Sequence, residues 1–229
     1  MQYFTEGFNN FFKGLAANNH KDWFHEHKKT YEKEVKQAFA RFLTDLIQNI
    51  RTQYDSTLDL EVKNAVFRIN RDIRFSKDKT PYKLHRSAVI SQAGRKNMQI
   101  PGLYIQFGVG EVWLGGGMYK PDKENLLLIR EHIAKNPKQV QELLADPAFQ
   151  RLYGTIQGEQ IKRIPKAFKE AHAIQPLIAN KQFYFMAEYT DNESLLLRED
   201  LMDWVLNHYK IGRAWNQFFS AAMEAEKEA

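Results

Sequence analysis

The chain has 229 residues, no cysteine and a formal net charge of +5, and 43% of its residues are hydrophobic and 13% aromatic. This content suffices for a sizeable core, so we expect a folded protein, and the missing thiols exclude disulfides, thiol nucleophiles and cysteine-ligated metals. No apolar run approaches the ~20 residues of a membrane-spanning helix and the first residues do not resemble a signal peptide, so we expect a cytoplasmic protein without membrane contact.

Helices are predicted for the first fifty residues. A short helix over residues 4–13 is expected to end at Gly14, and a long helix to run from Asn18 or Asn19 to about Ile50. Apolar residues recur every three or four positions along the long helix, which predicts one buried face. The members of this face are Phe24, His27, Tyr31, Val35, Phe39, Phe42, Leu46 and Ile50.

A period of two follows in the middle of the chain and predicts strands. Residues 58–75 place Phe67, Ile69, Ile73 and Phe75 on one face and Arg68, Asn70, Asp72 and Arg74 on the other. Residues 99–107 and 111–114 read as a hairpin joined through residues 108–110. Residues 181–189 are predicted to form a further strand.

Helices are predicted again after the hairpin. Pro121 is suited to the first turn of one helix, which Asn136-Pro137 is expected to end, and short helices are expected over residues 138–179. The last two are predicted over residues 196–210 and 213–226, with Gly212 as the break between them. Strands gathered in the centre, with helices at both ends of the chain, predict one α+β domain with a mainly antiparallel sheet over residues 1–229.

Residues 67–83, FRINRDIRFSKDKTPYK, resemble the central motif of the family catalogued as domain of unknown function 2461. Three further stretches match that family in order, at residues 14–24, 115–121 and 162–166. The resemblance implies a family domain over about residues 4–222. It implies no activity, so function has to be argued from the residues.

The positive charge is concentrated in residues 67–96, which hold nine of the 33 Lys and Arg residues and two of the 28 acids. This segment therefore carries +7 and the rest of the chain −2. Guanidinium groups match phosphate and carboxylate, so the leading hypothesis is a cationic pocket for a phosphorylated or carboxylated small molecule, with binding and catalysis both open. The candidate ligand-binding residues are Arg68, Asn70, Arg71, Asp72, Arg74, Lys77, Lys79, Tyr82, Lys83, Gly116, Gly117, Tyr119, Lys162, Arg163 and Lys166.

Other interpretations stay open. The basic segment also fits a nucleic-acid-binding module, in which Phe67, Phe75 and Tyr82 would stack on bases. A third hypothesis is a structural or partner-binding protein, in which Asp72 and Asp78 neutralise part of the cluster as ion pairs. Gly115-Gly116-Gly117 fits a phosphate-binding backbone nest, and it fits equally a bulge or a close strand–helix contact.

Two residues of the basic segment stand out. Arg71 falls by alternation on the apolar face with Ile69 and Ile73, so it is expected to be paired there or to mark a twist of the strand. His85 follows the basic motif, and it fits either a histidine that titrates near neutrality beside an anionic ligand or a hydrogen-bonded structural histidine.

The sequence assigns no reaction, cofactor or oligomeric state. His25 and His27 point to different sides of a helix, so no metal site is predicted from the histidines near them. No nucleophile elbow, paired-carboxylate signature or metalloprotease motif indicates a reaction class, and the catalytic residues are therefore unknown.

Overall fold

The computed structural model describes residues 1–224. Its centre is a sheet of four antiparallel strands in the order β1-β2-β3-β4, so that consecutive strands are neighbours. The strands are β1 (His85–Ile90), β2 (Leu103–Gly108), β3 (Glu111–Met118) and β4 (Phe183–Thr190). The α+β class, the antiparallel sheet and the helices at both ends agree with the expectation from sequence.

Helices precede, interrupt and follow the sheet. Before β1 lie α1 (Glu6–Ala17), α2 (Lys21–Glu26), α3 (Lys28–Thr30), the π-helix η1 (Tyr31–Gln37), α4 (Ala38–Gln53) and α5 (Val62–Ala65). The short 3-10 helix η2 (Gly94–Lys96) joins β1 to β2. Between β3 and β4 lie α6 (Lys123–Lys135), α7 (Pro137–Ala145), α8 (Pro147–Tyr153), η3 (Lys166–Phe168), α9 (Lys169–Ile174) and η4 (Pro176–Ala179). After β4 follow η5 (Leu195–Leu197) and α10 (Leu201–Glu224). In the part of the chain that the structure describes, no helix is both long enough and apolar enough to cross a membrane.

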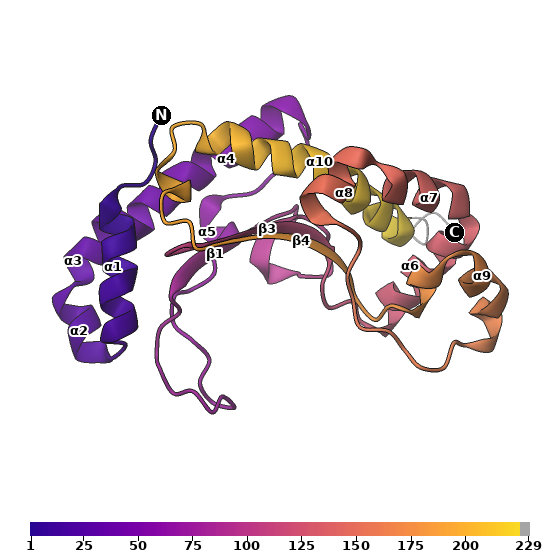
Figure 1. Ribbon diagram of the computed structural model, residues 1–229, viewed down its shortest axis with the longest axis horizontal. Helices are drawn as coiled ribbons and strands as arrows, with labels where there is room; N and C mark the ends of the chain where they lie inside the picture. Colours follow the sequence, from indigo (N-terminus) through magenta and orange to yellow (C-terminus); the bar gives the residue numbers. More distant parts are fainter. Residues whose placement is uncertain (225–229) are drawn as a thin grey trace.

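One face of the sheet forms the core. Ala88, Ile105 and Leu114 lie opposite one another on β1, β2 and β3 and are all fully buried. Phe107 of the same face meets the rings of Phe4, Phe39 and Phe42 from the N-terminal helices. Figure 1 shows α4 and α10 on this side of the sheet, whereas the loop between α5 and β1 projects from the other side.

The predicted strand over residues 58–75 is wrong. This segment contains α5 and then an extended backbone with isolated bridges, Val66 to Ala88 and Asn70 to Tyr82. The strand at this edge is instead β1, which the sequence pattern did not reveal. Five of its six residues are buried, so it lacks the alternation that marks a strand with one solvent face.

Two glycines that were expected to end helices lie inside them. α1 runs past Gly14, and α10 continues through Gly212 as one helix. A Cβ on Gly14 would lie 2.6 Å from the indole of Trp23, and one on Gly212 would lie 2.5 Å from the ring of Phe185. Glycine is therefore used at both positions for close aromatic packing. The predicted end of the last helix, at residue 226, lies outside the described residues.

The predicted long helix is a succession of α2, α3, η1 and α4. The side chains of His27, Tyr31, Val35 and Phe39 follow one another at intervals of four. In an α-helix each such step drifts by about 40° around the axis. The segment Tyr31–Gln37 is a π-helix, and Tyr31, Val35 and Phe39 are all buried.

Candidate anion-binding site

Residues 67–83 form an arm, a two-stranded extension of the edge of the sheet. Its two sides are joined by backbone hydrogen bonds from Arg71 to Pro81 and from Lys83 to Ile69. The arm continues into β1, where the N–H of Phe67 donates to the carbonyl of Ser87. The family-like basic motif is thus a projecting loop of the sheet (Figure 1).

Three of the six Lys and Arg residues of the arm donate hydrogen bonds to other residues of the arm. Arg71 donates hydrogen bonds to both Asp78 and Thr80. It is therefore paired, which is one of the two outcomes expected for a cation in the apolar parity of this segment. Arg74 forms a two-point pair with Asp72, with Nη2 2.7 Å from Oδ2, and Lys79 donates to the carbonyl of Ile73. These hydrogen bonds lower the pKa of the Asp72 and Asp78 carboxyls to about 2.

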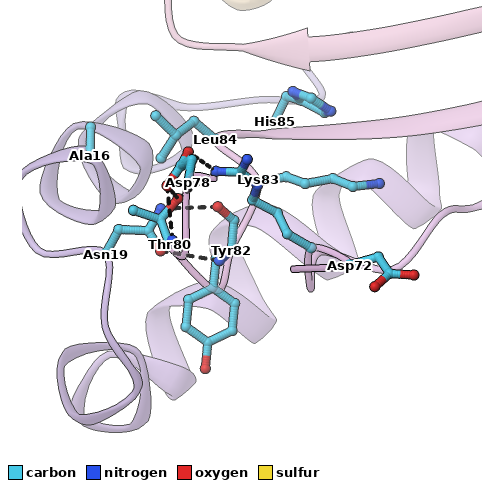
Figure 2. A pocket seen from close by; sticks show the side chains of 10 residues that line it. Ala16, Asn19, Asp72, Asp78, Thr80, Tyr82, Lys83, Leu84 and His85 are labelled. Carbon is cyan, nitrogen blue, oxygen red and sulfur yellow. Dashed lines mark hydrogen bonds and ion pairs between the residues drawn. The ribbon is translucent and has the colours of Figure 1, made fainter. Parts of the chain in front are cut away.

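The tip of the arm is exposed. Arg74 keeps 75% of its side chain accessible and Phe75 94% of its surface. Because Asp72 is ionised at neutral pH and paired, it is suited to orienting Arg74 and not to donating a proton. Figure 2 shows Asp72 pointing away from Asp78 and Thr80, so the two ion pairs of the arm are separate.

The base of the arm is anchored by a second family-like motif, residues 18–24. The side-chain amide of Asn19 donates to the carbonyl of Tyr82 and accepts from its N–H, as Figure 2 shows. The ring of Tyr82 stacks on Phe24, with centroids 4.1 Å apart. Tyr82 is therefore a buried packing residue that positions the arm.

His85 begins β1 beside this anchor and lines a shallow cavity with Asn19, Thr80 and Lys83. Burial, assisted by the nearby charges of Lys83 and Arg86, lowers the pKa of its imidazole to about 4. The burial of the ring favours the alternative of a structural histidine, and titration near neutrality beside an anionic ligand stays a prediction.

A prediction about pH follows from this imidazole. The unfolded chain binds a proton at His85 below pH ~6.5, whereas the folded protein does so only near pH 4, so acidification through this window costs stability, by about 1–3 kcal/mol. His85→Gln should flatten the fall in the free energy of unfolding between pH 7 and pH 4, measured by urea denaturation. His172→Gln, at a half-buried position of α9, is the control. An unchanged pH profile in His85→Gln would contradict the assignment.

A second cavity, of about 640 Å³, lies between the arm, β1 and the π-helix. Four cations and one phenol contribute to it, and we call it the arginine pocket: Tyr31, Lys36, Arg68, Arg86 and Arg95. Asn70, Phe24, Phe67, Val66 and Ile69 complete its lining, so no carboxylate lines it. Lys36 also pairs with Glu32, at 2.8 Å. Three arginines therefore face one cavity from three separate segments.

Arg86 is the least ordinary member of the arginine pocket. It lies on the apolar face of β1, in the same parity as Ala88, and is only 6% exposed. Its Nε has no hydrogen-bond partner, and within residues 1–224 the guanidinium forms no ion pair. The ring of Phe39 lies 5.8 Å from its Cζ. Burial lowers the pKa of Arg86, and the neighbouring Tyr31 opposes this shift.

The fifteen predicted site residues are dispersed over the molecule. Arg68 and Asn70 line the arginine pocket, Arg71, Asp72, Tyr82 and Lys83 line the cavity beside His85, and Arg74, Lys77 and Lys79 belong to the exposed end of the arm. Gly116, Gly117 and Tyr119 line a third cavity, on the open face of the sheet. Lys162, Arg163 and Lys166 are exposed residues between α8 and α9 and line none of these three cavities.

The phosphate-binding nest considered for Gly115-Gly116-Gly117 is wrong, because these residues form part of a strand. All three residues belong to β3 and pair with β4. The N–H of Gly117 donates to Oδ1 of Asn216 in α10, at 2.7 Å, so it is not available to a phosphate. The alternative of a close strand–helix contact agrees with the structure at Gly116, where a Cβ would lie 2.8 Å from Oδ1 of Asn216 in α10.

The sequence interpretation missed Arg86, Arg95, Lys36 and Tyr31 as members of one site. Arg86 carried a signal of the same kind as Arg71, a cation in the apolar parity of a strand, but the strand itself was not recognised. Lys36 and Tyr31 carried no such sequence signal, because they reach the pocket from a π-helix about fifty residues before Arg86 in the chain.

The comparisons with known proteins identify one family. A family model described as "Conserved hypothetical protein (DUF2461)" matches residues 8–218. No curated protein and no solved structure matches the chain. The match covers the arm, the arginine pocket and the whole sheet.

Proposed function

The chain belongs to the DUF2461 family, and from that premise we propose that it binds the phosphate or carboxylate group of a small molecule in the arginine pocket. The observation that carries this proposal is the buried guanidinium of Arg86, which has no acidic partner among the described residues.

An unpaired charge of this kind is costly in a folded protein. Removing a guanidinium from water without a compensating anion costs several kcal/mol, and an unsatisfied buried donor adds about 1–3 kcal/mol. The cation–π contact with Phe39 returns at most about 2 kcal/mol. The balance is unfavourable in the free protein and is reversed when an anion occupies the pocket.

The chemistry of the lining fits a tetrahedral or planar anion. Arg86 supplies a planar fork from the base of the pocket, and Arg68 and Arg95 are exposed enough to fold over a ligand. Tyr31 adds a hydroxyl from the π-helix, and π-turns occur often at functional sites. No general base is identified in the lining, so the proposal concerns binding.

Inorganic phosphate and citrate are the first probes. At about ten times the dissociation constant, either ligand should stabilise the folded protein by about 1.4 kcal/mol, which raises Tm by roughly 3–5 °C. Thermal unfolding in 20 mM phosphate or citrate, against sodium chloride of equal ionic strength, measures this. Equal shifts in chloride, or none in any salt, would contradict the proposal.

An oligonucleotide series separates this function from nucleic-acid binding. Tyr82 is stacked on Phe24 and buried, so of the three aromatic residues considered for base stacking only Phe75 is fully exposed. We therefore expect single-stranded DNA and RNA of 12 nucleotides to bind no more tightly than inorganic phosphate does, by fluorescence anisotropy at 50 mM salt. Micromolar binding that weakens steeply with salt would favour a nucleic-acid module instead.

A further inference from the structure

The second face of the sheet carries aromatic and polar side chains instead of a core. The pairing of the strands places Tyr104 beside Gly115 and Met186, and Trp113 between Gln106 and Glu188. No helix covers the middle of this face in Figure 1, where the arm and the segment around α9 lie at either end. Side chains of β2, β3 and β4 are therefore free to form a binding surface.

A cavity of about 500 Å³ lies on this face, and we call it the aromatic groove. Its lining includes four aromatic rings: Tyr104, Trp113, Tyr119 and Tyr184. Gly117, also in the lining, and the neighbouring Gly115 carry no side chain, and Met186 lies against the latter. Both glycines let β3 approach β4 closely beside the rings, because a Cβ would lie 2.3 Å from the carbonyl oxygen of Phe185 at Gly115 and 2.2 Å from that of Phe183 at Gly117.

One carboxylate, that of Glu188, and one ammonium group, that of Lys120, line the groove. Glu188 lines it directly opposite Trp113 in the strand pairing. Glu111, in the same parity of β3 as Trp113, accepts from Nε2 of Gln106 at 2.6 Å and adds a second carboxylate to this face. Aromatic π faces carry negative potential and attract ammonium groups, most strongly for tryptophan.

One aromatic face of the groove already holds a cation in this structure. The ammonium group of Lys120 lies 5.6 Å from the ring centroid of Tyr119. Tyr119 in turn packs edge to face against Tyr184, with centroids 5.2 Å apart, which fixes its orientation. Lys120 is exposed, so its ammonium group can leave for solvent when a better-matched cation enters.

We propose that the aromatic groove binds a small organic cation of the quaternary ammonium class. Its positive centre lies among the rings of Trp113, Tyr104 and Tyr184, with Glu188 as the counter-charge. The groove and the arginine pocket lie on opposite faces of the sheet and carry opposite chemistry, so this proposal does not rest on the anion site.

Choline and its neutral isostere 3,3-dimethylbutan-1-ol test the proposal, because they have the same shape and differ in charge. Choline should bind the full-length protein at least ten-fold more tightly, by isothermal titration calorimetry. Equal affinities would overturn the proposal, because they would mean that the groove is an apolar site alone. The absence of choline binding at 10 mM would overturn it as well.

Substitutions in the lining of the aromatic groove test whether choline binds there. Trp113→Leu and Glu188→Gln should each weaken choline binding at least five-fold, and Lys120→Gln should strengthen it about two-fold or more by removing the resident cation. Glu124→Gln, at an exposed position of α6, should change nothing. Urea denaturation checks folding without reference to either proposed binding site, and Trp113→Leu should retain a cooperative unfolding transition. Unchanged choline affinity in both Trp113→Leu and Glu188→Gln would overturn the assignment.

Discussion

Arg86→Met is expected to stabilise the ligand-free protein and to abolish its response to phosphate. Methionine fills a similar volume on the apolar face of β1 and removes an unpaired buried charge. The desolvation free energy recovered by removing the charge exceeds the cation–π energy lost with Phe39. We therefore expect the free energy of unfolding to rise by about 1–2 kcal/mol. Urea denaturation with and without phosphate measures both effects.

A matched variant separates the pocket from the arm. Arg74→Met also removes one guanidinium, but from an exposed position where the charge is paired with Asp72. We expect this variant to stay within about 0.5 kcal/mol of the wild type, as is usual for surface substitutions, and to keep its phosphate response. Destabilisation of Arg86→Met with retention of the phosphate response would assign Arg86 a structural role. Loss of the response in Arg74→Met alone would place the anion at the tip of the arm.

Gly117→Ala is expected to destabilise the protein by about 2–5 kcal/mol. Gly117 has φ +86°, a conformation that costs a residue with a Cβ about 1–2 kcal/mol. The added Cβ would also lie 2.2 Å from the carbonyl oxygen of Phe183, within the β3–β4 pairing, and such overpacking costs about 1–3 kcal/mol more. The free energy of unfolding, from urea denaturation, gives the sum.

Gly154→Ala isolates the backbone contribution. Gly154, after α8, has φ +74°, but nothing lies within 4 Å of the position that its Cβ would take. We expect Gly154→Ala to cost only the conformational part, about 1–2 kcal/mol, and less than Gly117→Ala. Equal losses in the two variants would contradict the close contact between β3 and β4 at Gly117.

The hairpin and the last strand were predictable because each has one buried face. β2, β3 and β4 alternate apolar and polar residues, and the two-residue connection Val109-Gly110 between β2 and β3 places Gly110 at φ +61°. β1 was not predicted, because residues on both of its faces are buried and the sequence therefore shows no alternation of apolar and polar residues. The alternation in the arm correctly placed Arg71 on the inner side. The same alternation wrongly predicted a regular strand, because an extended segment forms a strand only where a neighbouring segment pairs with it along its length.

The sequence located the segment that supplies most of the proposed site, whereas anion binding itself stays a prediction. The concentration of charge in residues 67–96 indicated an anion site, and Arg68, Arg86 and Arg95 of the arginine pocket do come from that segment. Counting charges could not separate paired from unpaired cations, because pairing depends on side-chain contacts such as Arg71 with Asp78 and Arg74 with Asp72. It is this pairing that moves the proposed site from the conspicuous arm to the less conspicuous Arg86.

The most direct test is the NMR signal of the Arg86 Nε–H group during a phosphate titration. The signal is assigned by its absence from spectra of Arg86→Met. The proposal predicts that it shifts and saturates with the same dissociation constant as the thermal stabilisation by phosphate, while the Arg74 signal stays within its shift in sodium chloride of equal ionic strength. An Arg86 signal that does not move while phosphate still stabilises the protein would contradict the arginine pocket as the anion-binding site.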